Sequence, residues 1–367
     1  MDGPGNNHLK IVRLNTQLSI KSLPNELIIE ILSRLPAKSI AICRHVCKEW
    51  ESLLRTPAFT DYFLAISSAQ PRILLTFKCS GKWHYCSTPQ PQDIDEELSA
   101  VEADYHMRLN GGSGPESCLS VQGFTCLIDR PFLMGKWERV PVICNPCTGQ
   151  RLTLPKVKAN NSDLRTFFGY DPINKQFKVL CMTVTNYRKQ VNSKEHQVLT
   201  IGKGRLSWRK IKCLFPHYPE RERDGICING NLYYVARSDK TCLIVSFDVR
   251  SEEFGEDLFG SHGELWVLDD TQKEKWFKHS FVSPNTDFEG VRSTWATDTG
   301  EIAWVISRWE NPFYVFFYNL DSKSVRRVEI TGIDDKVLKG IDRRAMARVN
   351  ALKQANNDHS RENRQDQ

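Results

Sequence analysis

The chain has 367 residues, of which 40% are hydrophobic and 26% are charged, as expected for a globular protein of two or three domains. The formal net charge is +6, but the segment from Lys336 onward has eight Lys/Arg and four Asp/Glu and therefore holds +4 of it. The rest of the chain is nearly neutral, which argues against a general nucleic-acid-binding or membrane-binding protein.

Whether the cysteines form disulfides depends on the cellular compartment of the protein. Twelve cysteines are present, yet no basic leader followed by an apolar stretch opens the sequence. No run of about 18 uninterrupted apolar residues occurs either. We therefore predict a cytoplasmic and/or nuclear protein in which the thiols stay reduced.

The N-terminal part is predicted to be a small all-α domain. Residues 1–18 show no sustained periodicity and are predicted to be a disordered leader, and the helical domain is placed at residues 19–66. Apolar residues recur at helical spacing between Ser22 and Arg55, and Pro24 and Pro36 mark helix boundaries. The pattern predicts three short helices. They carry more apolar surface than so small a domain can bury alone, so we expect a partner to cover part of it.

Residues 67–333 are predicted to form an all-β domain of repeated antiparallel sheets. Strands that begin after Gly123, Gly230 and Gly300 are followed by hairpins whose turns lie at Asn145, Asp248 and Asn319, which is 22, 18 and 19 residues later. This regular spacing is typical of a propeller-like array. Residues 89–114 are predicted to be a long surface loop that interrupts the pattern.

The C-terminal segment, residues 334–367, is predicted to be a basic polar tail. Residues 339–353 have the composition of a basic helix, and the residues from 354 onward are polar and predicted to be disordered.

The helical stretch resembles an F-box over the whole length of that motif. The matching residues are Leu23-Pro24, Glu26, Glu30-Ile31-Leu32, Arg34-Leu35-Pro36, Lys38-Ser39-Ile40, Val46-Cys47-Lys48 and Trp50. The resemblance implies binding to a Skp-family adaptor and, through it, to a cullin. It assigns the adaptor contacts to Leu23, Pro24, Ile31, Leu32, Leu35, Pro36, Val46, Cys47 and Trp50. Residues 41–44 depart from the family pattern, which affects the expected affinity more than the assignment.

The β region resembles the F-box-associated domain of plant F-box proteins. The similarity runs from Arg72 to Thr331 and rests on motifs such as NPCTGQRLTLP, FFGYDPINKQFKVL and ICINGNLYYVA. It implies a propeller-like domain that recruits a substrate. Only nine residues separate Phe254 from Glu264, where the family has a further glycine-led strand. This shortened repeat leaves open whether the array closes or exposes an edge.

Few residues have side chains suited to catalysis or metal binding, and none of them forms a complete site. Cys144 and Cys147 have C-x-x-C spacing, but without a second pair a structural turn is the preferred interpretation. A looser cluster of Cys79, His84 and Cys86 also lacks a fourth ligand. The acidic pairs Glu252-Glu253 and Asp269-Asp270 are predicted to lie at turns and face solvent. We assign no catalytic, cofactor-binding or metal-binding residue and predict that the protein is not an enzyme.

These observations lead to one main hypothesis and two alternatives. The main hypothesis is a substrate-recognition subunit of an SCF-type ubiquitin ligase, with the F-box on the adaptor and the β domain on an unknown target protein. One alternative is a propeller-like lectin or enzyme with an incidental F-box match. The other is an adaptor-binding protein without a degradation target.

Overall fold

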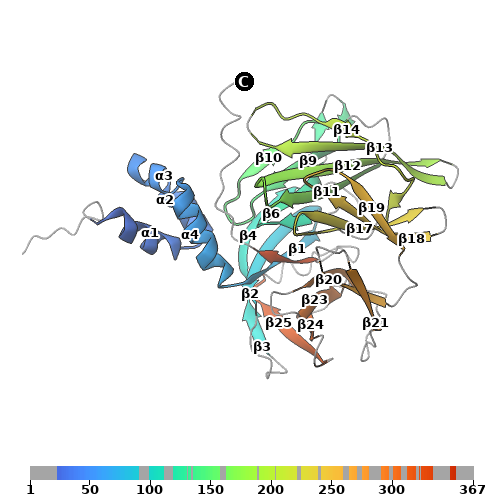
Figure 1. The fold of residues 1–367 in the computed structure, drawn as a ribbon. Coiled ribbons are helices and arrows are strands. Elements are labelled where there is room, and N and C mark those ends of the chain that lie inside the picture. Colours follow the sequence, from blue (N-terminus) through green and yellow to red (C-terminus); the bar gives the residue numbers. More distant parts are fainter. Residues whose placement is uncertain are drawn as a thin grey trace, which may run out of the picture.

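The fold consists of a small helical domain attached to one side of a larger β domain, in agreement with the predicted fold class (Figure 1). The computed structural model describes residues 23–90, 99–110, 119–129, 131–133, 135–157, 163–187, 190–202, 204–220, 225–238, 241–258, 264–270, 275–280, 291–296, 301–306, 312–319, 322, 324–333 and 348–352. The predicted leader, residues 1–18, lies outside this set. Within it, no helix is long and apolar enough to span a membrane.

Four helices form the helical domain: α1 (Asn25–Ser33), α2 (Ala37–Cys43), α3 (Lys48–Leu53) and α4 (Pro57–Ser68). Pro24 and Pro36 each precede a helix with an extended backbone, which is the conformation expected for a residue that flanks a helix start. At α4 the Thr56 hydroxyl accepts a hydrogen bond from the Phe59 amide (3.2 Å), and Pro57 takes the first helical position. The three predicted helices are confirmed, and α4 follows them.

The β domain contains five sheets of four or five strands among the described residues. In sheet order, the first sheet comprises β26 (Arg348–Leu352), β1 (Arg72–Cys79), β2 (Lys82–Pro89) and β4 (Asp104–Asn110), and the second β10 (Arg151–Thr153), β9 (Val140–Cys144), β6 (Phe124–Asp129) and β5 (Leu119–Val121). The third comprises β11 (Asp163–Asp171), β12 (Gln176–Tyr187), β13 (Gln190–Ile201) and β14 (Arg209–Ile211), and the fourth β15 (Tyr218–Pro219), β17 (Asn231–Ser238), β18 (Thr241–Asp248) and β19 (Phe254–Leu258), with β16 (Ile226–Ile228) paired to β17. The fifth comprises β22 (Val291–Ala296), β23 (Glu301–Ile306), β24 (Phe313–Asn319), β25 (Val325–Thr331) and β3 (Ser99–Glu102).

The predicted repeat is visible in the turns of three sheets. Asp248 and Asn319 each end a strand, and Asn145 directly follows one. The side-chain oxygen of each accepts backbone N–H groups two or three residues later. Each of these residues also donates its own backbone N–H to a carbonyl five residues later, at 2.9 to 3.0 Å. An asparagine or aspartate therefore builds the same turn in the second, fourth and fifth sheets.

A second recurring turn explains the glycines that precede strands. Gln122-Gly123 and Asn229-Gly230 have positive φ at both residues, 50° and 79° in the first pair and 48° and 90° in the second. This is the two-residue turn that matches the twist of an antiparallel hairpin, and glycine adopts it without strain. The turns join β5 to β6 and β16 to β17.

Two strand pairings tie the ends of the β domain together. The C-terminal strand β26 pairs antiparallel with β1, and β3 pairs with β25 of the fifth sheet, in parallel. The first and last sheets thus each contain strands from both ends of the domain, so the array closes on itself. The parallel pair is an exception to the predicted antiparallel pattern.

These pairings show that two local predictions were wrong. Residues 89–114 contain β3 and β4, so they are not one long loop. Both strands form because they pair at the edges of two sheets, although the polar sequence of this segment has only a weak strand pattern. Residues 348–352 form β26 where a basic helix was expected, because tertiary pairing with β1 overrides local helix propensity.

A small sheet follows the shortened repeat. After β19, β20 (Glu264–Asp270) pairs with β21 (Lys275–Ser280), and within the described part of the chain this sheet has two strands. A further two-stranded sheet consists of β7 (Phe132–Leu133) and β8 (Lys136–Trp137).

Candidate docking surface

The helical domain separates its apolar residues into a buried face and an exposed face. In α1, Ile28 and Leu32 are buried, whereas Leu27 and Ile31, each one position earlier, are exposed at 45% and 54%. The spacing of four residues places Leu27 and Ile31 on one side of the helix. Along the α2 segment, Ile40 is fully buried while Ile42 is exposed. The domain therefore has a core and, on other sides of the same helices, apolar side chains in solvent.

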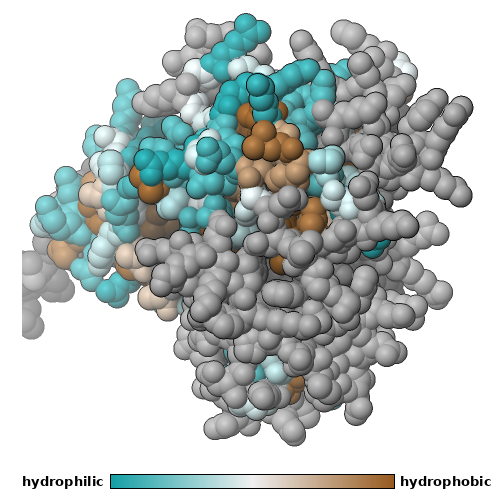
Figure 2. Space-filling view, turned by 45° about the vertical axis from the view of Figure 1, so that its right-hand side comes forward, coloured by the Kyte–Doolittle hydropathy of each residue, from teal (hydrophilic) through white to brown (hydrophobic). Residues whose placement is uncertain are grey.

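The exposed apolar residues are concentrated in this domain. Ten large apolar side chains are exposed among the described residues, and five of them lie between residues 27 and 62. We call four of these the docking surface: Leu27, Ile31, Ile42 and Val46. Figure 2 shows apolar side chains among hydrophilic ones on the projecting helical domain. Exposed apolar groups gathered on a small domain are typical of a protein-binding site.

The predicted adaptor contacts occupy different environments. Pro24, Ile31, Pro36 and Val46 are exposed, and Leu23, Leu35, Cys47 and Trp50 are partly buried. Leu32 is 4% exposed and packs in the core of the domain. Leu27 and Ile42 are exposed but were not among the predicted contacts, although the spacing of Leu27 and Ile31 was a usable signal. The adaptor-binding role of all these residues stays a prediction.

The helical domain packs against the β domain through α4. Phe59 and Phe63 of α4 are stacked, with ring centroids 6.0 Å apart, and both are buried. One continuous hydrophobic cluster joins them to core residues of the first sheet: Leu74, Trp83, Tyr85 and Leu109. Figure 1 shows α4 as the helix nearest this sheet. The docking surface is therefore held on the β domain by a shared core.

An ion-pair network joins the third and fourth sheets. Glu252, in the turn after β18, accepts hydrogen bonds from Lys178 of β12 (2.7 Å) and from Arg209 of β14. Burial alone would raise the pKa of Glu252, but these hydrogen bonds outweigh it and hold the pKa below its ordinary value. The side chain is only 10% exposed, so the prediction of a solvent-facing Glu252 was wrong. Glu253 is exposed as expected, and the side chains of Asp269 and Asp270 lie outside the described set.

The C-x-x-C pair forms a structural turn. Cys144 and Cys147 are buried, and the Cys144 thiol lies 2.8 Å from the Thr125 hydroxyl. Asn145 between them accepts the backbone N–H of Cys147, so its side chain closes the turn. Burial raises the pKa of Cys144 to about 11 and that of Cys147 to about 12, which disfavours the thiolate that a metal ion requires.

The side chains of the looser cluster, Cys79, His84 and Cys86, lie on the first sheet and pack against its other residues. The His84 ring stacks on Phe77, with centroids 5.4 Å apart, and its Nδ1 lies 3.3 Å from the Tyr105 hydroxyl. Burial raises the pKa of Cys86 to about 12. Within the described ranges, Cys79, His84 and Cys86 do not form a group with metal-ligand geometry.

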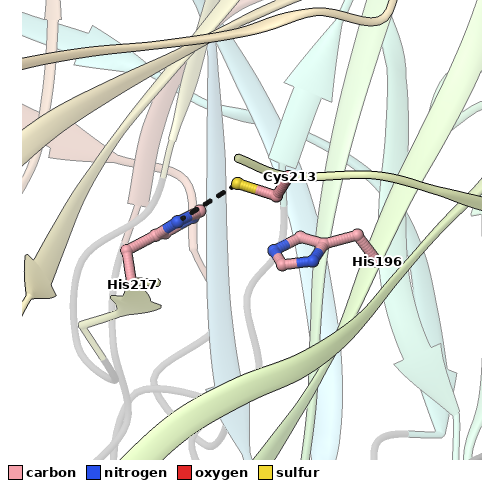
Figure 3. A group of neighbouring side chains, drawn as sticks. All are labelled: His196, Cys213 and His217. Atoms are coloured by element: carbon pink, nitrogen blue, oxygen red, sulfur yellow. Dashed lines mark hydrogen bonds between the residues drawn. The ribbon is translucent and has the colours of Figure 1, made fainter. Parts of the chain in front are cut away.

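One group of metal-ligating side chains does converge, and the sequence did not indicate it. His196 from β13 meets Cys213 and His217 from the segment between β14 and β15, with all ligand atoms within 4.8 Å of one another (Figure 3). Burial lowers the pKa of both histidines to about 4, so both imidazoles are neutral at pH 7. The three residues come from strand and connection positions that only the folded sheets bring together.

A pocket lies between the second and third sheets. It is a small, partly open pocket with a cavity volume of about 40 Å³. Its lining is mainly apolar: Phe124, Ile143, Leu152, Phe168, Phe177 and Ile201, with Asn145, Gln150 and Arg151 among the polar residues. Arg151 is exposed. The pocket has the composition of a site for an apolar group beside a cationic side chain.

Comparison with known proteins gives consistent matches over both domains. The model of the F-box domain matches residues 20–62, and that of the F-box associated beta propeller domain matches residues 72–260 and 257–359. The putative F-box protein At1g46984 of Arabidopsis thaliana is 48% identical over 351 residues, covering 89% of this chain and 90% of the relative. F-box protein DOR of the same species is 38% identical over 357 residues, covering 86% of this chain and 89% of the relative.

Proposed function

Because the chain belongs to the F-box proteins with an F-box-associated β-propeller domain, we propose that it is the substrate-recognition subunit of an SCF-type ubiquitin ligase. The observation that supports this role most directly is the docking surface, where apolar side chains of the F-box remain in solvent although the domain already has its own core. A Skp-family adaptor covers these side chains and links the chain to a cullin.

Adaptor binding is driven by burial of apolar area. Ile31 and Val46 are exposed at 54% and 62%, so each has a large apolar area to lose on contact with a partner. Full burial of such a side chain contributes about 1.5–3 kcal/mol, and a few of them account for most of the affinity of a typical interface. Among the other predicted contacts, Pro24 is exposed before α1, and Leu23 and Trp50 are half-buried and also pack against the core of the helical domain.

The β domain holds the target protein in this proposal. The pocket between the second and third sheets accepts an apolar side chain of the target, with Arg151 beside it for an acidic neighbour. The chain supplies proximity between target and ubiquitin-transfer machinery and performs no covalent step itself. It acts in the cytoplasm and/or nucleus.

The proposal is tested by capture of a Skp-type adaptor with the full chain. The triple variant Leu23→Ala, Pro24→Ala, Trp50→Ala should lose the adaptor while keeping the wild-type circular-dichroism spectrum of the β domain. Undiminished capture by this variant contradicts the docking assignment. Proximity labelling with the proteasome blocked should then identify target proteins, and their ubiquitination should require both domains. Turnover of a substrate or glycan binding by the β domain with β26 included, residues 72–352, would instead support the alternative of an enzyme or lectin.

A further inference from the structure

We propose that His196, Cys213 and His217 form a binding site for a thiophilic divalent metal ion, with Zn²⁺ as the ion that fits the donor set. Two imidazoles and one thiolate are ligands that zinc prefers in proteins. The three side chains meet where the chain passes from the third sheet to the fourth (Figure 3). The site shares no residue with the docking surface or with the pocket.

The distances are close to those of a metal centre. The Cys213 Sγ and His217 Nδ1 atoms are 3.7 Å apart, and all three ligand atoms lie within 4.8 Å of one another. Zinc–nitrogen bonds of about 2.0 Å and zinc–sulfur bonds of about 2.3 Å place tetrahedral ligand atoms about 3.5 Å apart. The Sγ–Nδ1 pair at 3.7 Å is already close to this spacing, and the widest pair has to close by up to about 1.3 Å.

Tyr234 positions His217 for metal binding. The Tyr234 hydroxyl is buried 2.7 Å from His217 Nε2 and lies 3.9 Å from the Met182 sulfur. In the metal-free protein the Nδ1–H of His217 donates to the Phe215 carbonyl at 3.3 Å, and Nε2 accepts from the Tyr234 hydroxyl. When the ion binds at Nδ1, the proton moves to Nε2, which then donates to the Tyr234 oxygen, and the hydroxyl proton turns toward the Met182 sulfur. A metal-ligating histidine usually has such a hydrogen-bond partner on its other ring nitrogen, which fixes the orientation of the ring.

The carbonyl of Phe215 lies next to the remaining ligand position. Its oxygen is 3.3 Å from Cys213 Sγ and 3.3 Å from His217 Nδ1. When the ion binds, the Cys213 thiol releases its proton to solvent and the S–H donor to this carbonyl is lost. The fourth position is then filled by the Phe215 oxygen or by a water molecule. Cys213 is partly exposed, which provides a path for the ion.

The position of the site defines its role. His196 is anchored in β13, whereas Cys213 and His217 lie in the connection that leads from the third sheet to the fourth. A bound ion fastens this connection to β13 and thereby stabilises the junction of the two sheets. The metal site is therefore a structural cross-link within the β domain.

The test uses the full chain, freed of metal by a chelator and then titrated with Zn²⁺ against a chromophoric competitor. We expect one equivalent to bind and to raise Tm, because an ion that binds only the folded state stabilises it. Co²⁺ in place of zinc should show the charge-transfer band of a thiolate ligand. Cys213→Ser should abolish this band, whereas the matched control Cys227→Ser, on β16, should retain it.

The variant Tyr234→Phe distinguishes a metal-binding site from a group of side chains that only pack together. This variant keeps the ring in the core but loses the hydroxyl, so zinc affinity should fall about tenfold. The proposal is overturned if the metal-free wild-type chain binds no zinc, or if Cys213→Ser and Tyr234→Phe both bind zinc with wild-type affinity. A folded Tyr234→Phe variant keeps the test decisive even if Cys213→Ser fails to fold.

Discussion

Single residues in the F-box show how neighbouring positions divide between folding and binding. Leu32 and Ile31 are adjacent in sequence, both were predicted adaptor contacts, and their exposed fractions are 4% and 54%. The apolar periodicity of the sequence predicted the helix correctly, whereas the assignment of both residues to the adaptor came from the resemblance to an F-box and stays a prediction. The difference in exposure between the two side chains depends on how α1 packs against α4 and the β domain, and the local sequence pattern does not contain this information.

Leu32→Ala should therefore reduce stability, and Ile31→Ala should not. Removing the buried Leu32 side chain leaves a cavity and should lower the free energy of unfolding by about 2–5 kcal/mol. The exposed Ile31 makes fewer contacts, so its replacement should change that energy by less than about 0.5 kcal/mol. Urea denaturation of both variants measures the difference, and equal losses would contradict the assignment of Leu32 to the core.

His106 should make the fold sensitive to acid. Burial, together with the charges of Arg72 and Lys38, lowers its pKa to about 4, although Asp104 acts in the opposite direction. Between pH 6.5 and 4 the unfolded chain takes up a proton that the folded chain excludes, so stability falls as pH falls, by up to about 1.4 kcal/mol per pH unit.

The measurement is Tm between pH 7 and pH 5 for the wild type and His106→Gln. The glutamine can still hydrogen-bond to Ser87, which lies 2.7 Å from His106 Nε2. The variant should lose Tm less steeply than the wild type on acidification. His45→Gln, which alters an exposed histidine of the F-box, should keep the wild-type slope. Identical slopes for wild type and His106→Gln would refute the prediction.

At the scale of elements, the sequence identified the turns better than the contacts between sheets. Asn145, Asp248 and Asn319 were recognised because short polar side chains build such turns from local hydrogen bonds. The Glu252 network was missed because Lys178 and Arg209 are far away in sequence. Strands β3 and β26 were missed for the same reason, since their partners lie at the other end of the domain.

Glu252→Gln should weaken the junction of the third and fourth sheets. The substitution leaves the largely buried Lys178 without a compensating charge, so the free energy of unfolding should fall by about 2 kcal/mol. The neighbouring exposed residue offers a matched control, and Glu253→Gln should stay within about 0.5 kcal/mol of wild type. Chemical denaturation measures the free energy of unfolding of the two variants. Equal values for both would show that the ion-pair network makes no net contribution to stability.

At the scale of the whole molecule, closure of the β domain depends on its C-terminal strand. The sequence predicted the repeated sheets but left open whether the array closes, because the shortened repeat removed one expected strand. The pairing of β26 with β1 joins the C-terminal end of the domain to its first sheet and covers an edge of that sheet. The same sheet packs under α4 and thus supports the F-box.

A chain that ends at residue 347 should lose closure. Without β26, the backbone N–H and C=O groups of β1 that pair with it lose their partners, so Tm should fall and the protein should aggregate more readily. A chain that ends at residue 352 keeps β26 and should melt like the wild type. Thermal melting with light scattering compares the two truncations, and wild-type behaviour of the shorter one would argue against closure through β26.

The central claim is that the docking surface of the F-box binds a Skp-family adaptor, and an affinity measurement on the full chain tests it most directly. Calorimetric titration should give one adaptor per chain for the wild type. Ile31→Glu combined with Val46→Glu places charges on two exposed apolar positions, so binding should weaken at least about 100-fold while Tm stays unchanged. Wild-type affinity in this folded double variant would contradict the account.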